Sequence, residues 1–353
     1  MAERTDQPAG RTGTMLASYV LTLVDAIRQI APHAVDAILA DAGIRAEALA
    51  RPDGRVDMPS VDRLWQGAIE HTGEPHLGLR VGAMVRPATF NLLGHVTMTA
   101  PTVGAAMAQA ARLSPLVGPD GALTVENVGP LVRLALSPRV MEWPYRAHRV
   151  EAVLAATLVF ARWAAGSPIA PRRVVFSHRR RPYDHKAEDA DPYQELFAAP
   201  VVFGGKTDAM EFARETLALP IREADPTLHR LLLEQAEQRL HAQLGVDCIR
   251  YQVRQQVHAL LIAGDVPRLH NIAARLNLSP RSLQRRLQDL GCKLGDEVTA
   301  VRRELAEYYL SRADLSIEAI SQKLGYSEIS AFTRAFRQWT GSPPMRYRRP
   351  VEV

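Results

Sequence analysis

The sequence has few of the features that secreted, membrane-spanning or metal-binding proteins need. Only two cysteines occur in the 353 residues, Cys248 and Cys292, and their spacing fits neither a zinc site nor a disulfide framework. We therefore expect two reduced thiols in a cytoplasmic protein. Residues 1–14 are polar and lack the apolar core of a secretory signal, so we expect a disordered tail there. The longest apolar segment, 150–165, is interrupted by charged residues and is too short to span a membrane.

Common catalytic motifs are also missing. The sequence contains neither the Gly-x-Ser-x-Gly turn of serine hydrolases nor the His-Glu-x-x-His helix of zinc proteases. Segment 204–206 lacks the spacing of a phosphate-binding loop, so we interpret it as a tight turn. His71, His76 and His95 have no metal-like spacing and are interpreted as structural histidines. We therefore expect no catalytic residue, no bound metal and no cofactor.

Charge is distributed unevenly along the chain. Residues 266–353 contain 15 Arg and Lys against 9 Asp and Glu, whereas the rest of the chain contains 28 against 29. A basic segment beside a nearly neutral remainder is typical of a polyanion-binding module joined to another domain. The length fits two or three domains, and a hydrophobic content of 47% supplies apolar residues for their cores.

Residues 15–222 show a mixture of helical and strand patterns. Apolar residues recur at helical spacing in four segments: 15–50, 61–71 (opened by Ser60), 102–116 and 150–165. Strand-like patterns occur in four shorter segments: 122–126, 131–136, 173–177 and 201–203. The sequence therefore predicts an α+β domain that ends near Pro220.

Residues 223–264 are predicted to form helices that link the two parts of the chain. One apolar stripe runs from Leu228 to Leu244 and a second runs from Val253 to Leu261. Such a stripe packs either on its own domain or on a second subunit. We favour the first, and the second would make this segment a dimerisation surface.

Residues 265–350 contain a divergent internal repeat with an offset of about 48 residues. Each copy predicts a short helix that ends at a residue tolerant of left-handed backbone, Asn277 or Gly325. An apolar residue and a serine follow, and then a second helix begins. This order is typical of a helix-turn-helix unit, whose second helix enters the major groove of DNA. The sequence thus predicts an all-α C-terminal domain with two such units.

The second helix of the first copy has a complete start signal. Ser279 is placed to accept a hydrogen bond from an exposed amide of the first turn, and Pro280 fits the first helical position. With Leu283 and Leu287 facing inward, the outer face presents five polar residues: Arg281, Ser282, Gln284, Arg285 and Gln288. Arginine pairs bidentately with guanine and glutamine with adenine, so this face is suited to reading bases.

The outer face of the corresponding helix in the second copy is less polar. Arg334 can reach a base or a phosphate, Ser330 can bond either, and Ile329 and Ala331 can at most touch a thymine methyl. We therefore expect this unit to bind more through backbone and shape than through base edges. The segment between the copies, 296–310, has the composition of a helix. If rigid, it would place the two recognition helices in successive major grooves, about 34 Å apart.

These residues resemble the AraC/XylS family of bacterial regulators over residues 266–350. The second copy carries the most specific part: Ile320, Leu324-Gly325-Tyr326-Ser327, Ala331-Phe332, Arg334-Ala335-Phe336, Trp339, Gly341 and Pro343. The resemblance implies seven base-facing positions: Arg281, Gln284 and Arg285 in the first unit, and Ile329, Ser330, Ala331 and Arg334 in the second. Leu294 stands where related sequences usually carry phenylalanine, so packing after the first unit is expected to differ slightly.

Residues 15–222 resemble the larger arabinose-binding type of sensor domain found with ornithine-utilisation regulators and mycobacterial virulence regulators. The similarity lies in Leu93-Gly94-His95, in segment 176–182 and in Pro200-Val201-Val202-Phe203. It implies a regulatory domain that binds a small-molecule effector, dimerises, or both, without identifying the effector. We expect a homodimer that binds double-stranded promoter DNA and contacts RNA polymerase. Activation is expected because most members of the family are activators.

Two rival functions remain open. A DNA-binding protein without sequence preference would bind random DNA nearly as well as a promoter. An enzyme domain joined to a related DNA-binding unit, as in some DNA-repair methyltransferases, would need clustered reactive thiols, whereas Cys248 and Cys292 are isolated.

Two further groups of residues allow more than one interpretation. Segment 178–181, His-Arg-Arg-Arg, can hold an anionic effector, although we prefer a solvated loop. Four aromatic residues can line a ligand pocket, although we prefer core positions for them: Trp65, Trp143, Tyr145 and Trp163.

Overall fold

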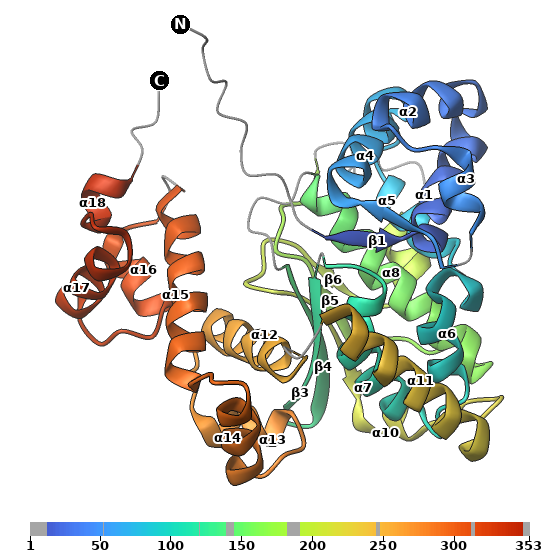
Figure 1. The fold of residues 1–353 in the computed structure, drawn as a ribbon. Helices are drawn as coiled ribbons and strands as arrows, with labels where there is room; N and C mark the ends of the chain where they lie inside the picture. Colours follow the sequence, from blue (N-terminus) through green and yellow to red (C-terminus); the bar gives the residue numbers. More distant parts are fainter. Residues whose placement is uncertain are drawn as a thin grey trace, which may run out of the picture. The chain divides into compact units, whose positions relative to one another are not determined.

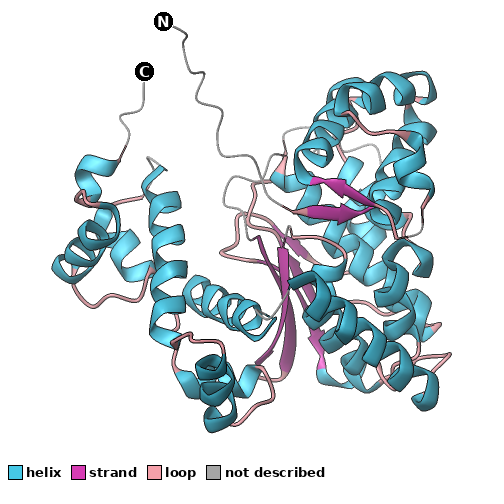
Figure 2. Cartoon of the chain, in the orientation of Figure 1, coloured by secondary structure: helices cyan, strands magenta, loops and turns pink. Residues whose placement is uncertain are grey.

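The computed structural model describes residues 13–51, 53–119, 121–138, 145–181, 191–244, 248–311 and 315–348. The chain forms two compact units, the N-terminal unit Met1–Arg239 and the C-terminal unit Leu240–Val353. The N-terminal unit combines helices with a five-stranded sheet, and the described part of the C-terminal unit is helical (Figure 1, Figure 2). The predicted fold class is confirmed. Most of the predicted tail lies outside the described residues, and the domain boundaries at 222 and 264 stay predictions.

The N-terminal unit begins with a helical layer around its own apolar core. Its elements are β1 (Thr14–Leu16), α1 (Ala17–Ile30), η1 (Pro32–Ala34), α2 (Val35–Ala42), α3 (Ala46–Ala50), β2 (Arg55–Asp57), α4 (Met58–Thr72) and α5 (Leu77–Ala83). β1 and β2 pair antiparallel. Helix α4 was predicted to open at Ser60, and this prediction is wrong. Asp57 caps the helix instead, because its carboxylate accepts a 2.9 Å hydrogen bond from the Ser60 amide.

The five-stranded sheet forms the second part of the unit, in the order β3-β4-β7-β5-β6. Its strands are β3 (Gly121–Val128), β4 (Leu131–Pro138), β5 (Arg173–Val175), β6 (Val201–Val202) and β7 (Asp208–Ala213). β3, β4, β7 and β5 pair antiparallel in turn, and β6 pairs parallel with β5. The central strand, β7, was not predicted. It carries Asp208 and Glu211, both buried, which break the apolar pattern expected of a central strand.

Helices complete the N-terminal unit. They are η2 (Pro87–Phe90), α6 (Asn91–Met98), α7 (Val103–Leu113), η3 (Ser114–Leu116), α8 (Arg146–Ala165), α9 (Pro192–Phe197) and α10 (Arg214–Ala218). Helix α8 packs most extensively against α5, where Gly78 and Gly82 allow a backbone-to-backbone approach. A Cβ atom at position 78 would overlap the carbonyl of His148, and one at position 82 would overlap Ala155. Residues of α8 belong to two apolar cores, the helical layer through Ala152 and the sheet region through Leu154 and its neighbours.

Two long helices, α11 (Pro226–Leu244) and α12 (Cys248–Ala263), cover the predicted linking segment. The predicted stripe of α11 is only partly buried. Ala236 and Leu240 are buried, whereas Leu228 and Leu231 are 44% and 52% exposed. On α12, the predicted stripe of Val253, Val257, Leu260 and Leu261 is fully buried. Whether the α11 stripe contacts a second subunit stays a prediction.

The described residues that follow α12 form six helices, two similar groups and one helix between them. They are α13 (Leu269–Arg275), α14 (Pro280–Asp289), α15 (Leu294–Ser311), α16 (Ile317–Lys323), α17 (Ile329–Thr340) and α18 (Pro344–Tyr347). Helices α13 and α14 form the first helix-turn-helix unit, and α16 and α17 form the second. Helix α15 runs between them, with α13 and α14 at its beginning and α16 to α18 beside its later part (Figure 1). The predicted double helix-turn-helix architecture is confirmed.

Candidate nucleic-acid interface and ligand cavity

The turn of the first helix-turn-helix unit forms as its sequence predicts. Asn277 adopts a left-handed conformation with φ 54°, and the Leu278 amide returns to the Ala273 carbonyl at 2.9 Å. Ser279 then caps α14, because its hydroxyl accepts a 3.1 Å hydrogen bond from the Ser282 amide. Pro280 occupies the first helical position. The start of α14 is thereby fixed by local chemistry.

Helix α14 separates a buried face from a polar one. Leu283 and Leu287 are buried, while Arg281, Gln284 and Arg285 are exposed. Ser282 is half-buried, since its amide and hydroxyl both interact with Ser279. The three long side chains therefore share the solvent-facing side of a helix whose position is set by its apolar side.

The second unit repeats this arrangement with different residues. Gly325 has φ 73°, and the Tyr326 amide bonds to the Ser321 carbonyl at 3.1 Å. Helix α17 begins at Ile329, and Phe332 and Phe336 bury its inner side.

On the outer side of α17, Ser330 and Arg334 are exposed, Ile329 is 43% exposed, and Ala331 is half-buried. The Ser330 hydroxyl lies 2.9 Å from a carboxylate oxygen of Glu328. An acidic neighbour at the start of the helix makes this face less favourable for phosphate than that of α14.

Helix α15 is attached to the second unit by Arg302. Its Nε donates a 3.0 Å hydrogen bond to the Leu324 carbonyl, at the end of α16, and its guanidinium lies 4.8 Å from the ring centroid of Tyr326. Burial raises the pKa of the Tyr326 phenol, so the ring stays uncharged beneath the cation. These contacts were not predicted, since the sequence gives no sign that a linker residue reaches the turn.

Helix α15 is also attached to α12 through a buried carboxylate. Glu297, 2% exposed, accepts from Arg250 at 2.7 Å and lies 3.4 Å from Arg254, which also pairs with Glu304. Leu294, the predicted departure from the family pattern, is half-buried at the first position of α15. Together with Arg302, these ion pairs hold α15 between two partners, which is what a rigid spacer requires.

The N-terminal unit contains a cavity of about 140 Å³. Helices α1, α4, α5, α6, α7 and α8 and strands β3 and β4 contribute to its wall. The principal apolar lining residues are Met15, Val20, Leu23, Val61, Val81, Phe90, Leu93, Leu123, Leu136, Val153, Ala156 and Phe160. Trp65 also lines it and is buried, so the core and pocket interpretations both apply to this residue. Trp163 is 51% exposed, which contradicts its predicted core position; Trp143 lies outside the described residues.

Four polar side chains of the cavity wall bond to the protein itself. The hydroxyls of Thr97, Thr157 and Ser114 each donate to a carbonyl of their own helical turn, at 2.9, 2.7 and 3.2 Å. The buried guanidinium of Arg149 donates to Asp62 at 2.6 Å and lies 5.8 Å from the ring of Trp65. Its positive charge is therefore matched by a carboxylate on α4.

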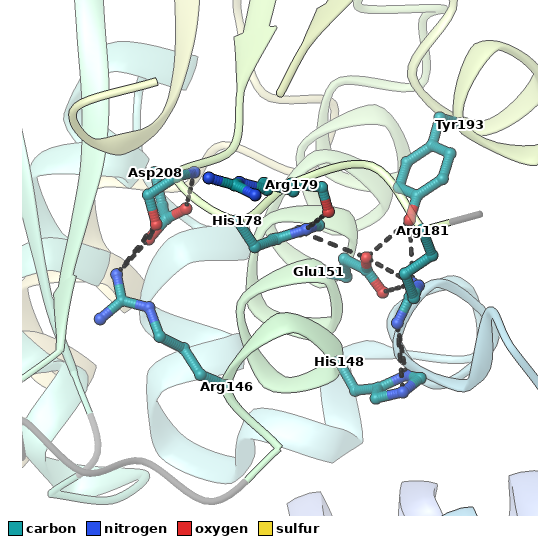
Figure 3. Close-up of polar contacts among 9 residues, drawn as sticks. Arg146, His148, Glu151, His178, Arg179, Arg181, Tyr193 and Asp208 are labelled. Carbon is teal, nitrogen blue, oxygen red and sulfur yellow. Dashed lines mark hydrogen bonds and ion pairs between the residues drawn. The ribbon is translucent and has the colours of Figure 1, made fainter. Parts of the chain in front are cut away.

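A buried polar network lies between α8, α9 and segment 178–181 (Figure 3). The Glu151 carboxylate is fully buried and accepts from Arg181 Nη2 at 2.6 and 2.8 Å and from the Tyr193 hydroxyl at 2.7 Å. Burial would lower the pKa of Arg181, but the adjacent Glu151 and Tyr193 together outweigh it and raise the pKa. Arg180 pairs with Asp191 at 2.8 Å. The preferred interpretation of segment 178–181 as a solvated loop therefore holds for the exposed Arg179 and is wrong for Arg181.

His148 borders this network as a neutral imidazole. Arg181 Nη1 lies 3.1 Å from its Nε2. Burial first, and then the positive charge of Arg181, lowers the pKa of His148 to about 3.

On the other side of the view, Arg146 pairs with Asp208 at 2.6 Å, and Asp208 also accepts from the Ser177 amide (Figure 3). These bonds explain how strand β7 tolerates a buried aspartate.

Within the described residues, no group of three or more His, Cys, Asp or Glu side chains is arranged to hold a metal ion. In the same residues, no helix combines the length and the apolar character that crossing a membrane requires.

Comparison with known proteins gives two family matches and several relatives. A model of the arabinose-binding domain of AraC transcription regulators matches residues 33–221, and a model of a helix-turn-helix domain matches residues 272–350. The ornithine utilization regulator of Pseudomonas aeruginosa is 29% identical over 97% of this chain and 98% of that protein. The HTH-type transcriptional regulator VirS of Mycobacterium tuberculosis is 26% identical over 84% of this chain and 85% of that protein. The crystal structure of transcriptional regulator CdpR from Pseudomonas aeruginosa covers 89% of this chain and 96% of its own, with 23% identity and a TM-score of 0.43.

Proposed function

Since this chain belongs to the AraC family of transcription regulators, with an N-terminal ligand-binding domain and a C-terminal helix-turn-helix domain, we propose that it is an effector-responsive activator that reads promoter DNA with two recognition helices. One observation carries this proposal. Arg281, Gln284 and Arg285 are exposed on α14, Arg334 is exposed on α17, and both helices belong to units joined by α15.

The first recognition helix supplies most of the base reading. Arg281 and Arg285 offer bidentate donors to guanine, and Gln284 offers a donor and an acceptor to adenine. Ser279 and Ser282, at the start of α14, approach the phosphate backbone, where the helix N-terminus favours an anion. These contacts give α14 both a position on the duplex and a sequence preference.

The second recognition helix contributes mainly position and shape. Arg334 lies on the side of α17 opposite the buried phenylalanines and is its principal donor to DNA. Ile329 and Ala331 offer only apolar contact, and Ser330 is close to Glu328. Such a helix discriminates weakly among bases, and its contribution depends on being held at the correct distance from α14.

Effector binding is proposed for the cavity of the N-terminal unit. The chain acts as a homodimer without catalysis of its own, in the cytoplasm where its promoter and RNA polymerase are found. Effector binding alters the relative placement of the two DNA-binding arms of the dimer and so changes transcription. What supports the effector role is a mostly apolar cavity in the matched ligand-binding domain.

The test is a footprint and an affinity measurement on the full chain. DNA upstream of its own gene and of neighbouring genes would be probed for protection, and the dissociation constant for the protected site would be compared with that for a shuffled sequence at the same salt concentration. We expect a ratio of at least about 10³. A ratio near one would instead support a DNA-binding protein without sequence preference. Promoter binding and transcription that no metabolite of a broad panel changes would remove the effector role.

A further inference from the structure

The cavity lies where the two apolar cores of the N-terminal unit meet. Met15, Val20 and Trp65 on its wall belong to the core of the helical layer, whereas Leu136 belongs to the core of the sheet region. Helix α8 borders both cores and contributes five lining residues: Arg149, Val153, Ala156, Thr157 and Phe160. A molecule in this cavity would touch both halves of the unit at once.

Apart from the phenol of Tyr19, the wall has little hydrogen-bonding capacity to offer a ligand. Its three aliphatic hydroxyls, on Thr97, Ser114 and Thr157, use their protons on backbone carbonyls, so they remain acceptors only. Among the described residues of the wall, Arg149 is the only charged one, and Asp62 neutralises it at 2.6 Å. A ligand with several hydroxyls or with net charge would lose its bonds to water and regain few of them.

The size of the cavity favours a small ligand. At about 140 Å³ it is close to the roughly 150 Å³ of an engineered apolar cavity that binds benzene. That volume takes one six-membered ring with one or two small substituents, or a short branched aliphatic chain.

We propose that this cavity binds a small, uncharged, predominantly apolar molecule of about the size of one aromatic ring, and not a sugar or a charged amino acid. The assignment of that molecule as the effector rests on the proposed function, whereas its chemical class rests on the cavity wall alone. The name of the matched arabinose-binding domain would suggest a sugar as the ligand, and that of the similar ornithine utilization regulator would suggest a charged amino acid. The cavity wall favours neither. Each hydroxyl of a pentose buried without a partner would weaken binding about tenfold.

The test uses the full chain and four probes: indole and toluene as uncharged apolar rings, L-arabinose as a sugar, and L-ornithine as a charged amino acid. Melting temperature would be followed with all four probes. Tryptophan fluorescence would be followed with toluene, L-arabinose and L-ornithine, because Trp65 lines the cavity and indole itself fluoresces as tryptophan does. We expect indole or toluene to raise the melting temperature by about 5–10 °C at a hundredfold excess over Kd. Arabinose and ornithine should leave it unchanged at the same concentrations.

Two variants locate the binding site. Ala156→Leu and Ala110→Leu each narrow the cavity from a different helix, α8 or α7, and each should abolish the shift. The second variant keeps the test valid if the first fails to fold. Tighter binding of arabinose or ornithine than of either ring, or no binding by any probe, would overturn the proposal. Promoter selectivity, measured separately, tests the proposed function. If a ring binds without a change in transcription, the chemical class of the site stands and only its role as the effector site is removed.

Discussion

The guanidinium of Arg302, on the helix that joins the two DNA-binding units, lies 4.8 Å from the ring centroid of Tyr326 in the turn of the second unit. Its hydrogen bond to the Leu324 carbonyl, at 3.0 Å, adds direction to the cation–π contact. Because of these two interactions, α15 cannot rotate relative to α16 without losing both of them. Helix α15 can therefore act as a rigid spacer between the two units.

Arg302→Ala should therefore destabilise the C-terminal unit by about 1–2 kcal/mol, through loss of one hydrogen bond and one cation–π contact. It should also weaken binding to the protected promoter site more than binding to a single half of that site. Denaturant unfolding and half-site titrations would measure both effects. Arg303→Ala is the matched control, because Arg303 is exposed and bonds to Glu307 of its own helix. Equal effects of the two substitutions would refute the spacer role.

Arg285→Ala should cost about 1–3 kcal/mol at the promoter site and relax preference at one base position. Arg285→Lys keeps the charge but loses the bidentate geometry, so it should relax the same position. Arg286→Ala, on the flank of the same helix, should leave base preference unchanged. Selection of binding sites from a randomised library would read out the preference. Uniform weakening by Arg285→Ala on every sequence would make Arg285 a phosphate contact.

Glu151→Gln should lower the free energy of unfolding by about 3–5 kcal/mol, because the substitution leaves the buried Arg181 charge without its carboxylate. The amide keeps the shape of the side chain, so the loss would be electrostatic. Glu195→Gln, at an exposed position of α9, is the control and should have little effect. Thermal and denaturant unfolding would measure the difference. A stability equal to that of the parent chain would show that the ion pair between Glu151 and Arg181 does not stabilise the fold.

The N-terminal unit should lose stability in mild acid because His148 stays neutral when folded. Its pKa is lowered to about 3, whereas an unfolded histidine takes up a proton near pH 6.5. The free energy of unfolding therefore falls as the pH drops from 6.5 towards 3, by at most about 1.4 kcal/mol per pH unit, or about 2 kcal/mol between pH 7.5 and 5. His148→Gln should flatten this slope, while His71→Gln, at an exposed position, should keep it. Parallel pH profiles for the parent chain and His148→Gln would rule out His148 as the source.

Leu231→Ser should shift the proposed homodimer towards monomer, since Leu228 and Leu231 expose apolar surface one turn apart on α11. Sedimentation velocity over a concentration series would measure the dissociation constant, which we expect to rise at least tenfold. Leu219→Ser, at another exposed leucine, should leave it unchanged. An unaltered dimer in both variants would place the subunit contact elsewhere.

The helix-turn-helix units could be predicted because their signals are local. Ser279, Pro280 and Asn277 lie within four residues of one another, and each fixes a backbone conformation by itself. The interactions of the N-terminal unit could not be predicted in this way. Strand β7 contains Asp208 and Glu211, and only partners distant in the sequence make their burial favourable: Arg146 for Asp208, and Arg133 with Arg173 for Glu211.

The cavity was beyond prediction for a related reason. Its lining residues come from segments between Met15 and Phe160, and each of them alone has the pattern of an ordinary core position. The role of Arg181 was also not predictable. It follows two other arginines in the sequence, and nothing in that run indicates which of the three pairs with Glu151. Burial of such groups depends on the tertiary fold and not on local propensity.

The glycine contacts between α5 and α8 carry an evolutionary consequence. Positions 78 and 82 have no space for even a methyl group against His148 and Ala155. A substitution at either position therefore requires a shift of α8. A homologue with alanine or serine at either position must carry its α8 farther from α5. The residues at positions 78 and 82, and that at position 155 facing position 82, should therefore record, across the family, how far apart these two helices lie.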